Sequence, residues 1–170
     1  MDTWDAIRSR KNIRTFRDEP IPANDLDRIL EAGRRSPSSG NRQRWDFVVV
    51  TDSGDLERLA QVWQGASHIA GATTALALVA PATDDPDLWG SIQYDLGQVT
   101  MSMMIMAADL GVGTAHAKVD DHEMAGEILG LPDDRQAVWL IGMGLPQPPL
   151  TPIKRPDRKE FEAVVHRDNW

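Results

Sequence analysis

Residues 34–47 read Arg34-Arg35-Ser36-Pro37-Ser38-Ser39-Gly40-Asn41-Arg42-Gln43-Arg44-Trp45-Asp46-Phe47. This stretch joins a helix-periodic segment to a strongly apolar one, and it is crowded with hydrogen-bonding side chains. Its proline and glycine restrict and bend the backbone, so that these side chains can converge. Four arginines surround it with positive charge, although the protein has a net charge of -8. Since the same residue types also favour an ordinary turn, the stretch is either a plain turn or a polar binding loop.

A second cationic cluster lies near the N-terminus and reads Arg8-Ser9-Arg10-Lys11-Asn12-Ile13-Arg14-Thr15-Phe16-Arg17. Five of these ten residues are cationic, and the asparagine adds an amide. Arginine and lysine are natural partners of phosphate, so the cluster indicates an anionic ligand. The alternative is a charge run that only contacts solvent.

Composition excludes several classes of function. A chain of 170 residues with 41% hydrophobic residues is expected to form a single soluble domain over residues 1–170. The acidic balance argues against nucleic acid as a partner. The absence of cysteine excludes disulfides and thiolate chemistry. The sequence shows neither a signal peptide nor an apolar run long enough to cross a membrane, so a cytoplasmic location is expected.

Known catalytic and metal-binding patterns are missing from the sequence. The histidines at positions 68, 116, 122 and 166 are scattered and lack ligand spacing, so no metal site is expected. There is no Gly-x-Ser-x-Gly elbow and no phosphate-binding loop, and Gly111-Val112-Gly113 follows a helix and lacks the third glycine of a dinucleotide fingerprint.

Hydrophobic periodicity predicts helices that alternate with buried strands, and therefore a layered α/β or α+β domain. The expected strands are 47–50, 73–80 and 136–143, the first of them in the interior of the sheet. Residues 115–119 form a short segment of undefined type. The expected helices are 2–9, 23–35, 53–64, 88–110, 121–130 and 158–166.

Two features favour a dimer. Residues 101–110 are apolar nearly all round the expected helix, which is easiest to bury if a second subunit covers one side. Prolines at 146, 148, 149, 152 and 156 predict an extended arm after residue 145.

Several motifs in chain order resemble those of the nitroreductase family, and together they cover nearly the whole chain. They are Arg10-Lys11-Asn12-Ile13-Arg14-Thr15-Phe16; the loop 36–47; Asp95-Leu96-Gly97 with 107–114; Leu129-Gly130-Leu131-Pro132 with 141–146; and Arg158-Lys159-Glu160-Phe161 with Val165, His166 and Trp170.

This resemblance implies an α+β fold with a central, mainly antiparallel sheet flanked by helices. It also implies an intertwined homodimer, embraced by arms of residues 145–170, with FMN at the subunit interface. The implied activity transfers electrons from NAD(P)H through flavin N5 to a small electrophilic acceptor such as a nitroaromatic or a quinone. No protein side chain is then needed as the catalytic group, because the cofactor carries the chemistry.

The resemblance also assigns residues to the cofactor. Arg14 would lie at the N1 and O2 edge, where a fixed cation stabilises the negative charge of reduced flavin. The backbone of residues 116–118 would face the flavin ring. The full implied set is Arg10, Lys11, Asn12 and Arg158 at the ribityl phosphate, Arg14, then His116, Ala117 and Lys118, and from the other subunit Pro37, Ser38, Ser39, Asn41 and Gln43.

The sequence departs from the family pattern in ways that leave other functions open. Asn12 replaces a usual serine, Arg44 replaces a usual proline, and residues 116–119 lack a usual glycine. The short excursion between residues 80 and 95 predicts an open substrate pocket. A flavin-binding or storage protein without turnover, or a specialised flavin enzyme such as a dehalogenase or ring oxidase, remains an alternative because a fold does not fix a function.

Overall fold

The computed structural model describes residues 1–151 and 157–170. Its strands form one sheet of order β1-β2-β4-β3, in which all neighbouring strands are antiparallel. The strands are β1 (Asp46–Val50), β2 (Thr74–Pro81), β3 (Gly113–Lys118) and β4 (Arg135–Gly144). The helices are α1 (Thr3–Ser9), α2 (Ala23–Arg34), α3 (Ser53–Leu59), α4 (Pro86–Asp109) and α5 (His122–Leu129), with short 3-10 turns η1 (Ser39–Asn41), η2 (Ser67–Gly71) and η3 (Phe161–Ala163).

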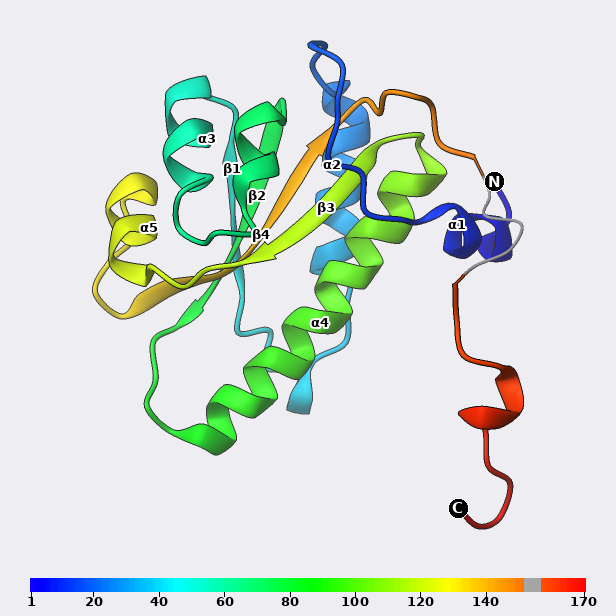
Figure 1. Cartoon of the computed structure of the whole chain (residues 1–170). Coiled ribbons are helices and arrows are strands. Elements are labelled where there is room, and N and C mark those ends of the chain that lie inside the picture. Colours follow the sequence, from blue (N-terminus) through cyan, green and yellow to red (C-terminus); the bar gives the residue numbers. More distant parts are fainter. Residues whose placement is uncertain (152–156) are drawn as a thin grey trace.

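Helices cover both faces of the sheet (Figure 1): α2 and α4 lie on one face, and α3 and α5 on the other. Side chains alternate along the strands except at one register shift between β2 and β4, so these two strands supply residues to two separate cores. Leu76 and Ile141 belong to the core under α2 and α4, whereas Ala77 and Leu140 belong to the core under α3 and α5. The predicted α+β class with a helix-flanked antiparallel sheet is confirmed.

The position predicted for residues 47–50 is wrong. These residues form β1, which lies at an edge of the sheet and pairs only with β2 among the described strands. They are nevertheless apolar on both sides because each face of β1 meets one of the two cores. Phe47 packs against the α2–α4 core, and Val48 against the α3–α5 core. The edge position is visible in Val49, which is 40% exposed.

Three other segments differ from the predictions by more than one or two residues, or in their type. The helix expected to reach residue 64 ends at Leu59, because residues 60–66 turn back through successive backbone bonds such as Ala66 N to Trp63 O (2.9 Å). The undefined segment 115–119 lies mostly in the strand β3, which runs from Gly113 to Lys118. The helix expected at 158–166 is only the 3-10 turn η3, since the side chains there have no core to pack against.

The long helix α4 carries most of its apolar residues into the core. Met103 and Met104 are buried, and Gly33 of α2 leaves room for the Met103 side chain, since a Cβ at Gly33 would overlap Met103 Cε. Met101 is 39% exposed, and Tyr94 is 71% exposed. The helix therefore has one face that remains exposed in the single chain.

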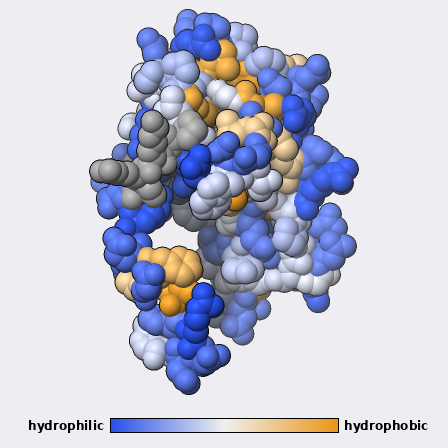
Figure 2. Space-filling view, turned by 90° about the vertical axis from the view of Figure 1, so that its right-hand side faces the viewer, coloured by the Kyte–Doolittle hydropathy of each residue, from blue (hydrophilic) through white to orange (hydrophobic). Residues whose placement is uncertain are grey.

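The C-terminal segment leaves the body of the molecule as an extended tail (Figure 1), and Figure 2 shows apolar surface on it. Its exposed apolar residues are Phe161, Val164, Val165 and Trp170. The predicted arm fits this course over its described part. Pro152, Pro156 and the neighbouring Arg155 lie outside the described residues.

Candidate functional site

The N-terminal cationic segment lies in extended form against the end of the sheet. Ile13 N donates to Thr114 O (2.8 Å), and Arg17 N donates to Leu145 O (2.8 Å). Residues 12–17 are therefore fixed to β3 and to the exit of β4 at two points. Figure 1 shows this segment crossing beside β3 after α1.

Two glycines make this close approach possible. A Cβ at Gly113 would lie 2.9 Å from Ile13 Cγ2, and a Cβ at Gly144 would lie 2.9 Å from both Cβ and Cγ of Phe16. Such distances are shorter than real Cβ contacts allow. Glycine at both positions thus lets the segment lie directly on the strands.

A pocket of about 490 Å³ opens between this segment, β3 and the turn after α3. Arg14 and Lys118 bring positive charge to it, and Trp63 and Trp139 bring flat apolar surface. The lining residues are Asn12, Arg14, Trp63, Gly65, Ser67, His116, Ala117, Lys118 and Trp139.

A second pocket of about 330 Å³ adjoins the first and shares His116 and Trp139 with it. The two rings are in edge-to-face contact, with centroids 6.0 Å apart and planes at 67°. Trp139 Nε1 donates to Gln93 Oε1 of α4 (2.9 Å), which fixes the indole. The remaining lining residues are Arg10, Gly97, Thr100, Met101 and Met104.

Positive charge reaches the wall of each pocket, since Arg10 lines the smaller pocket and Arg14 lines the larger. Arg10 Nε is buried and has no hydrogen-bond partner among the described residues. Although the His116 side chain reaches solvent, partial desolvation in the pocket lowers its pKa, and the positive charges of Arg10 and Arg14 lower it further. His116 is therefore neutral at pH 7, and the two arginines carry the local charge. Such a wall suits an anionic ligand.

Lys118 is held at the rim of the larger pocket. Its Nζ lies 5.3 Å from the centroid of the Trp63 ring and 2.6 Å from Asp120 Oδ1. Val62 O accepts from the backbone N–H groups of both Asp120 (3.1 Å) and Asp121 (3.0 Å), so the turn carrying Trp63 is tied to the end of β3. The Lys118 side chain therefore lies along this rim.

His68 supports the site strand from behind. It is 7% exposed, and its Nε2 lies 3.0 Å from Ala115 O. Burial lowers its pKa, so the ring is neutral near pH 7, and the nitrogen that faces a carbonyl must carry the proton and donate. A Cβ at Gly142 would lie 3.1 Å from His68 Cδ2, so the glycine makes room for the ring. His68 is thus a buried support for β3.

The polar loop 37–43 lies elsewhere, against α4. Ser39 N donates to both carboxylate oxygens of Asp95 (3.0 and 3.1 Å), and Ser39 Oγ donates to Oδ1 (3.3 Å). Pro37 lines a third pocket along the exposed face of α4, together with Tyr94 and Gln98. Residues 38, 39, 41 and 43 line neither of the two cationic pockets.

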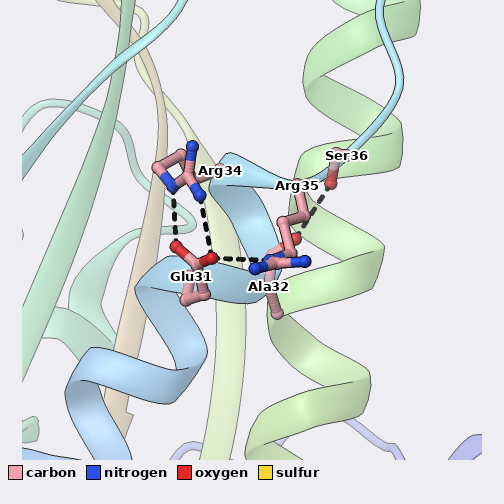
Figure 3. A network of polar contacts seen from close by, with 5 residues as sticks. All are labelled: Glu31, Ala32, Arg34, Arg35 and Ser36. Carbon is pink, nitrogen blue, oxygen red and sulfur yellow. Dashed lines mark hydrogen bonds and ion pairs between the residues drawn. The ribbon is translucent and has the colours of Figure 1, made fainter.

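Two of the four arginines around the loop are already paired (Figure 3). Arg34 donates to both carboxylate oxygens of Glu31 (2.6 and 2.9 Å), and Arg35 Nε also donates to it. The hydrogen bond from Arg34, and then that from Arg35, lowers the pKa of Glu31 to about 2. Ser36 Oγ donates to Ala32 O (3.3 Å) just beyond the end of the helix. These two cations belong to the end of α2 rather than to a ligand site.

The structure therefore brings together one part of the predicted site. Arg10, Asn12, Arg14 and residues 116–118 surround the two adjoining pockets, whereas Lys11 lines neither of them. Loop 37–43 lies apart from them in the same chain. Arg158 lies on the extended tail and is exposed.

Sequence reasoning missed several lining or supporting residues. Trp63, Gln93 and Trp139 carried no motif. Asp95 did carry a signal, since it is a carboxylate at a helical position between buried Ile92 and Leu96, and buried charges need partners.

Sequence comparison gives a match of residues 7–81 to the model of the nitroreductase family. A relative from Archaeoglobus fulgidus, provisionally named NADH dehydrogenase/NAD(P)H nitroreductase, is 27% identical over an alignment of 175 positions, gaps included, that covers 96% of each chain. The NADPH-flavin oxidoreductase of Vibrio harveyi is 27% identical over an alignment of 188 positions, gaps included, that covers 99% of this chain and 75% of that one. The FMN-dependent nitroreductase of Clostridium difficile superposes with a TM-score of 0.84 at 23% identity, covering 98% of this chain and 99% of that one.

The resemblance to the nitroreductase family is confirmed. The structural match extends over the nitroreductase fold as a whole, including the C-terminal half that the family model does not reach.

Within residues 1–151 and 157–170, no helix of this nitroreductase fold is long and apolar enough to cross a membrane. The same residues contain no cluster of His, Asp or Glu suited to a metal ion.

Proposed function

We propose that the protein is an FMN-dependent oxidoreductase that passes electrons from NAD(P)H to a small electrophilic acceptor such as a nitroaromatic or a quinone. The observation that carries the proposal is the pair of adjoining pockets, where cations of an acidic protein meet flat aromatic walls. The named activities of the relatives support it, since they use NADPH, flavin or FMN.

The residues present fit FMN. The buried Nε of Arg10 has no hydrogen-bond partner among the described residues, and a phosphate oxygen would satisfy it. Asn12 and Arg14 line the larger pocket with amide and guanidinium donors. The flat rings of His116 and Trp139 offer a surface for an aromatic system.

Bound FMN would supply two-electron chemistry, which the side chains described here do not provide on their own. Arg14 would stabilise negative charge at the cofactor edge by a fixed positive charge. Arg10, Lys11 and Arg158 would bind the phosphate. The backbone of His116, Ala117 and Lys118 would form the floor under the ring.

The proposal includes a homodimer in which Pro37, Ser38, Ser39, Asn41 and Gln43 reach the site of the other subunit. Two observations support it: this loop lies apart from the cationic pockets of its own chain, and α4 and the tail expose apolar residues. The chain is proposed to form a single domain, with residues 145–170 as the arm that embraces the second subunit.

Flavin titration tests the proposal. We expect the apoprotein to quench FMN fluorescence and to retain flavin absorbance after desalting. Arg14→Ala should raise the Kd for FMN by about tenfold or more, because a hydrogen bond to a charged group contributes about 1.5–3 kcal/mol. Arg58→Ala is the matched control, since Arg58 pairs with Asp55 on α3.

Rapid mixing of the flavin-loaded protein with NADH or NADPH then tests turnover. Bleaching of the flavin, followed by recovery on addition of menadione or nitrofurazone, is expected. Retained flavin without bleaching would identify a binding or storage protein. A protein that retains no flavin would contradict the proposal.

A further inference from the structure

Asp95 is a buried carboxylate whose partners come from a single distant residue. It is 2% exposed, and it accepts three hydrogen bonds, all from the backbone N–H and the hydroxyl of Ser39. No cation pairs with it in the described part of the chain. Burying a carboxylate without a cationic partner costs free energy, so we look for a role of Asp95 other than filling the core.

The loop that Asp95 binds has an unusual backbone. Gly40, Asn41 and Gln43 have φ angles of 59°, 54° and 48°. The left-handed region is open to glycine and accessible to asparagine, but it costs free energy for glutamine. Strained residues persist only where the surroundings enforce them, and they concentrate at ligand-binding sites.

Local hydrogen bonds complete this enforced shape. Ser38 O accepts from Asn41 N (2.9 Å), and Ser38 Oγ accepts from Gln43 N (3.0 Å). These bonds fix the loop internally, but they do not attach it to the rest of the molecule. The hydrogen bonds from Ser39 to Asp95 do so.

The loop does not line the two cationic pockets of its own chain. The exposed face of α4, with Gln93, Gly97 and Met101, lines both the smaller cationic pocket and the third pocket that contains Pro37. The loop therefore lies beside the exposed face of α4, against which the proposed second subunit would pack.

We infer that Asp95 is a positioning residue that acts in trans: by anchoring Ser39 it sets the shape of loop 37–43 for the cofactor site of the partner subunit. This inference rests on the proposed function. Asp95 itself touches neither cofactor nor substrate. Its carboxylate preorganises a loop whose affinity contribution appears in the other subunit.

Single substitutions give the first test. Asp95→Asn keeps the volume but turns one carboxylate oxygen into a donor that faces the Ser39 N–H. The Kd for FMN should rise by about tenfold, with little change in the melting temperature of the apoprotein. Asp87→Asn on the exposed N-terminal turn of α4 is the matched control and should bind FMN as the unsubstituted protein does.

Mixed dimers give the decisive test, because the two changes can be placed on different subunits or on the same one. One dimer pairs an Asp95→Asn subunit with an Arg10→Ala subunit. The other pairs an unsubstituted subunit with one that carries both changes. Two different affinity tags isolate each mixed dimer. Flavin absorbance per dimer is then measured at an FMN concentration that is too low to fill a site carrying either defect.

If Asp95 acts in trans, the first dimer contains one intact site and retains about half the flavin of the unsubstituted dimer, as two equivalent sites require. The second dimer then has a defect in each site and retains little. The reverse pattern would show that Asp95 acts within its own subunit and would overturn the inference while leaving the proposed function intact. An unsubstituted protein that retains no flavin would overturn both.

Discussion

Replacing Gly144 with alanine tests whether close packing of the N-terminal segment holds the cations of the pocket in place. The added Cβ would lie 2.9 Å from Cβ and Cγ of Phe16 and 3.0 Å from its Cδ1. These atoms form the base of the side chain, so rotation of the ring cannot relieve the overlap. The backbone of residues 12–17 has to move away from β4.

The magnitude follows from overpacking of a well-packed contact, which costs about 1–3 kcal/mol. For a chain of this length, that lowers the melting temperature by roughly 2–12 °C. Because Arg14 lies two residues before Phe16, the Kd for FMN should also rise by about tenfold, as for the loss of one charge-assisted hydrogen bond. Calorimetry and flavin titration measure the two effects.

Gly126→Ala is the matched control. Gly126 lies within α5, and a Cβ there would meet no described atom within 4 Å. Alanine is the better helix former, so this variant should gain about 0.5–1 kcal/mol in stability and bind FMN normally. If the melting temperature of Gly144→Ala and its Kd for FMN instead equalled those of the unsubstituted protein, the proposed role of glycine at this contact would be refuted.

Three further predictions concern the core and the charges. Met103→Ala removes a fully buried side chain and should cost about 2–5 kcal/mol in urea unfolding; a loss below the range would show that α2 and α4 can close the cavity. The pKa of His116 is lowered in the folded state, so the unfolded chain binds the proton more readily and stability falls as the pH drops below about 6.5. His116→Gln should reduce this fall in melting temperature between pH 7 and 5, and the buried His68 accounts for a slope that remains; an unchanged slope would assign the whole effect to other groups. Glu31 should titrate near pH 2 by carbon NMR, so its stabilising pairs are present above its ordinary pKa and are lost as the pH falls toward 2; a midpoint near the ordinary value would show that Arg34 and Arg35 do not pair with it in solution.

Periodicity predicted the elements that pack along most of their length. The helix expected at 23–35 is α2, and that at 88–110 is α4, each within two residues of the observed ends. These helices are long, and their buried faces repeat clearly. Shorter elements were less certain, because β3 is six residues long and its alternation of small and polar side chains gives little signal.

The sheet order could not be read from hydrophobicity alone. An apolar run on both faces of β1 indicated an interior strand, but such a run reports only that both faces are covered by helices. Which strands lie beside it depends on long-range pairing, which has no local signature.

The candidate site was predicted unevenly for a similar reason. The motifs identified Arg10, Asn12 and Arg14, because their types and spacing are unusual in an acidic chain. The motifs included Asp95 without assigning it a role, and they did not include Trp139. The role of Trp139 arises from its contacts with His116 of β3 and Gln93 of α4. The role of Asp95 arises from a loop 56 positions away. These contacts exist only in the folded chain.

The attachment of residues 12–17 to the far end of the sheet has a consequence for the order of folding. Thr114, Leu145 and Gln147, which exchange backbone hydrogen bonds with this segment, all lie on the order of a hundred residues later in the chain. Closing so long a loop costs entropy before any contact compensates for it, so these contacts form late. Residues 12–17 are synthesised early, but they reach their final position only after β4 has been synthesised and paired. During refolding, flavin uptake should therefore lag behind the recovery of helical circular dichroism.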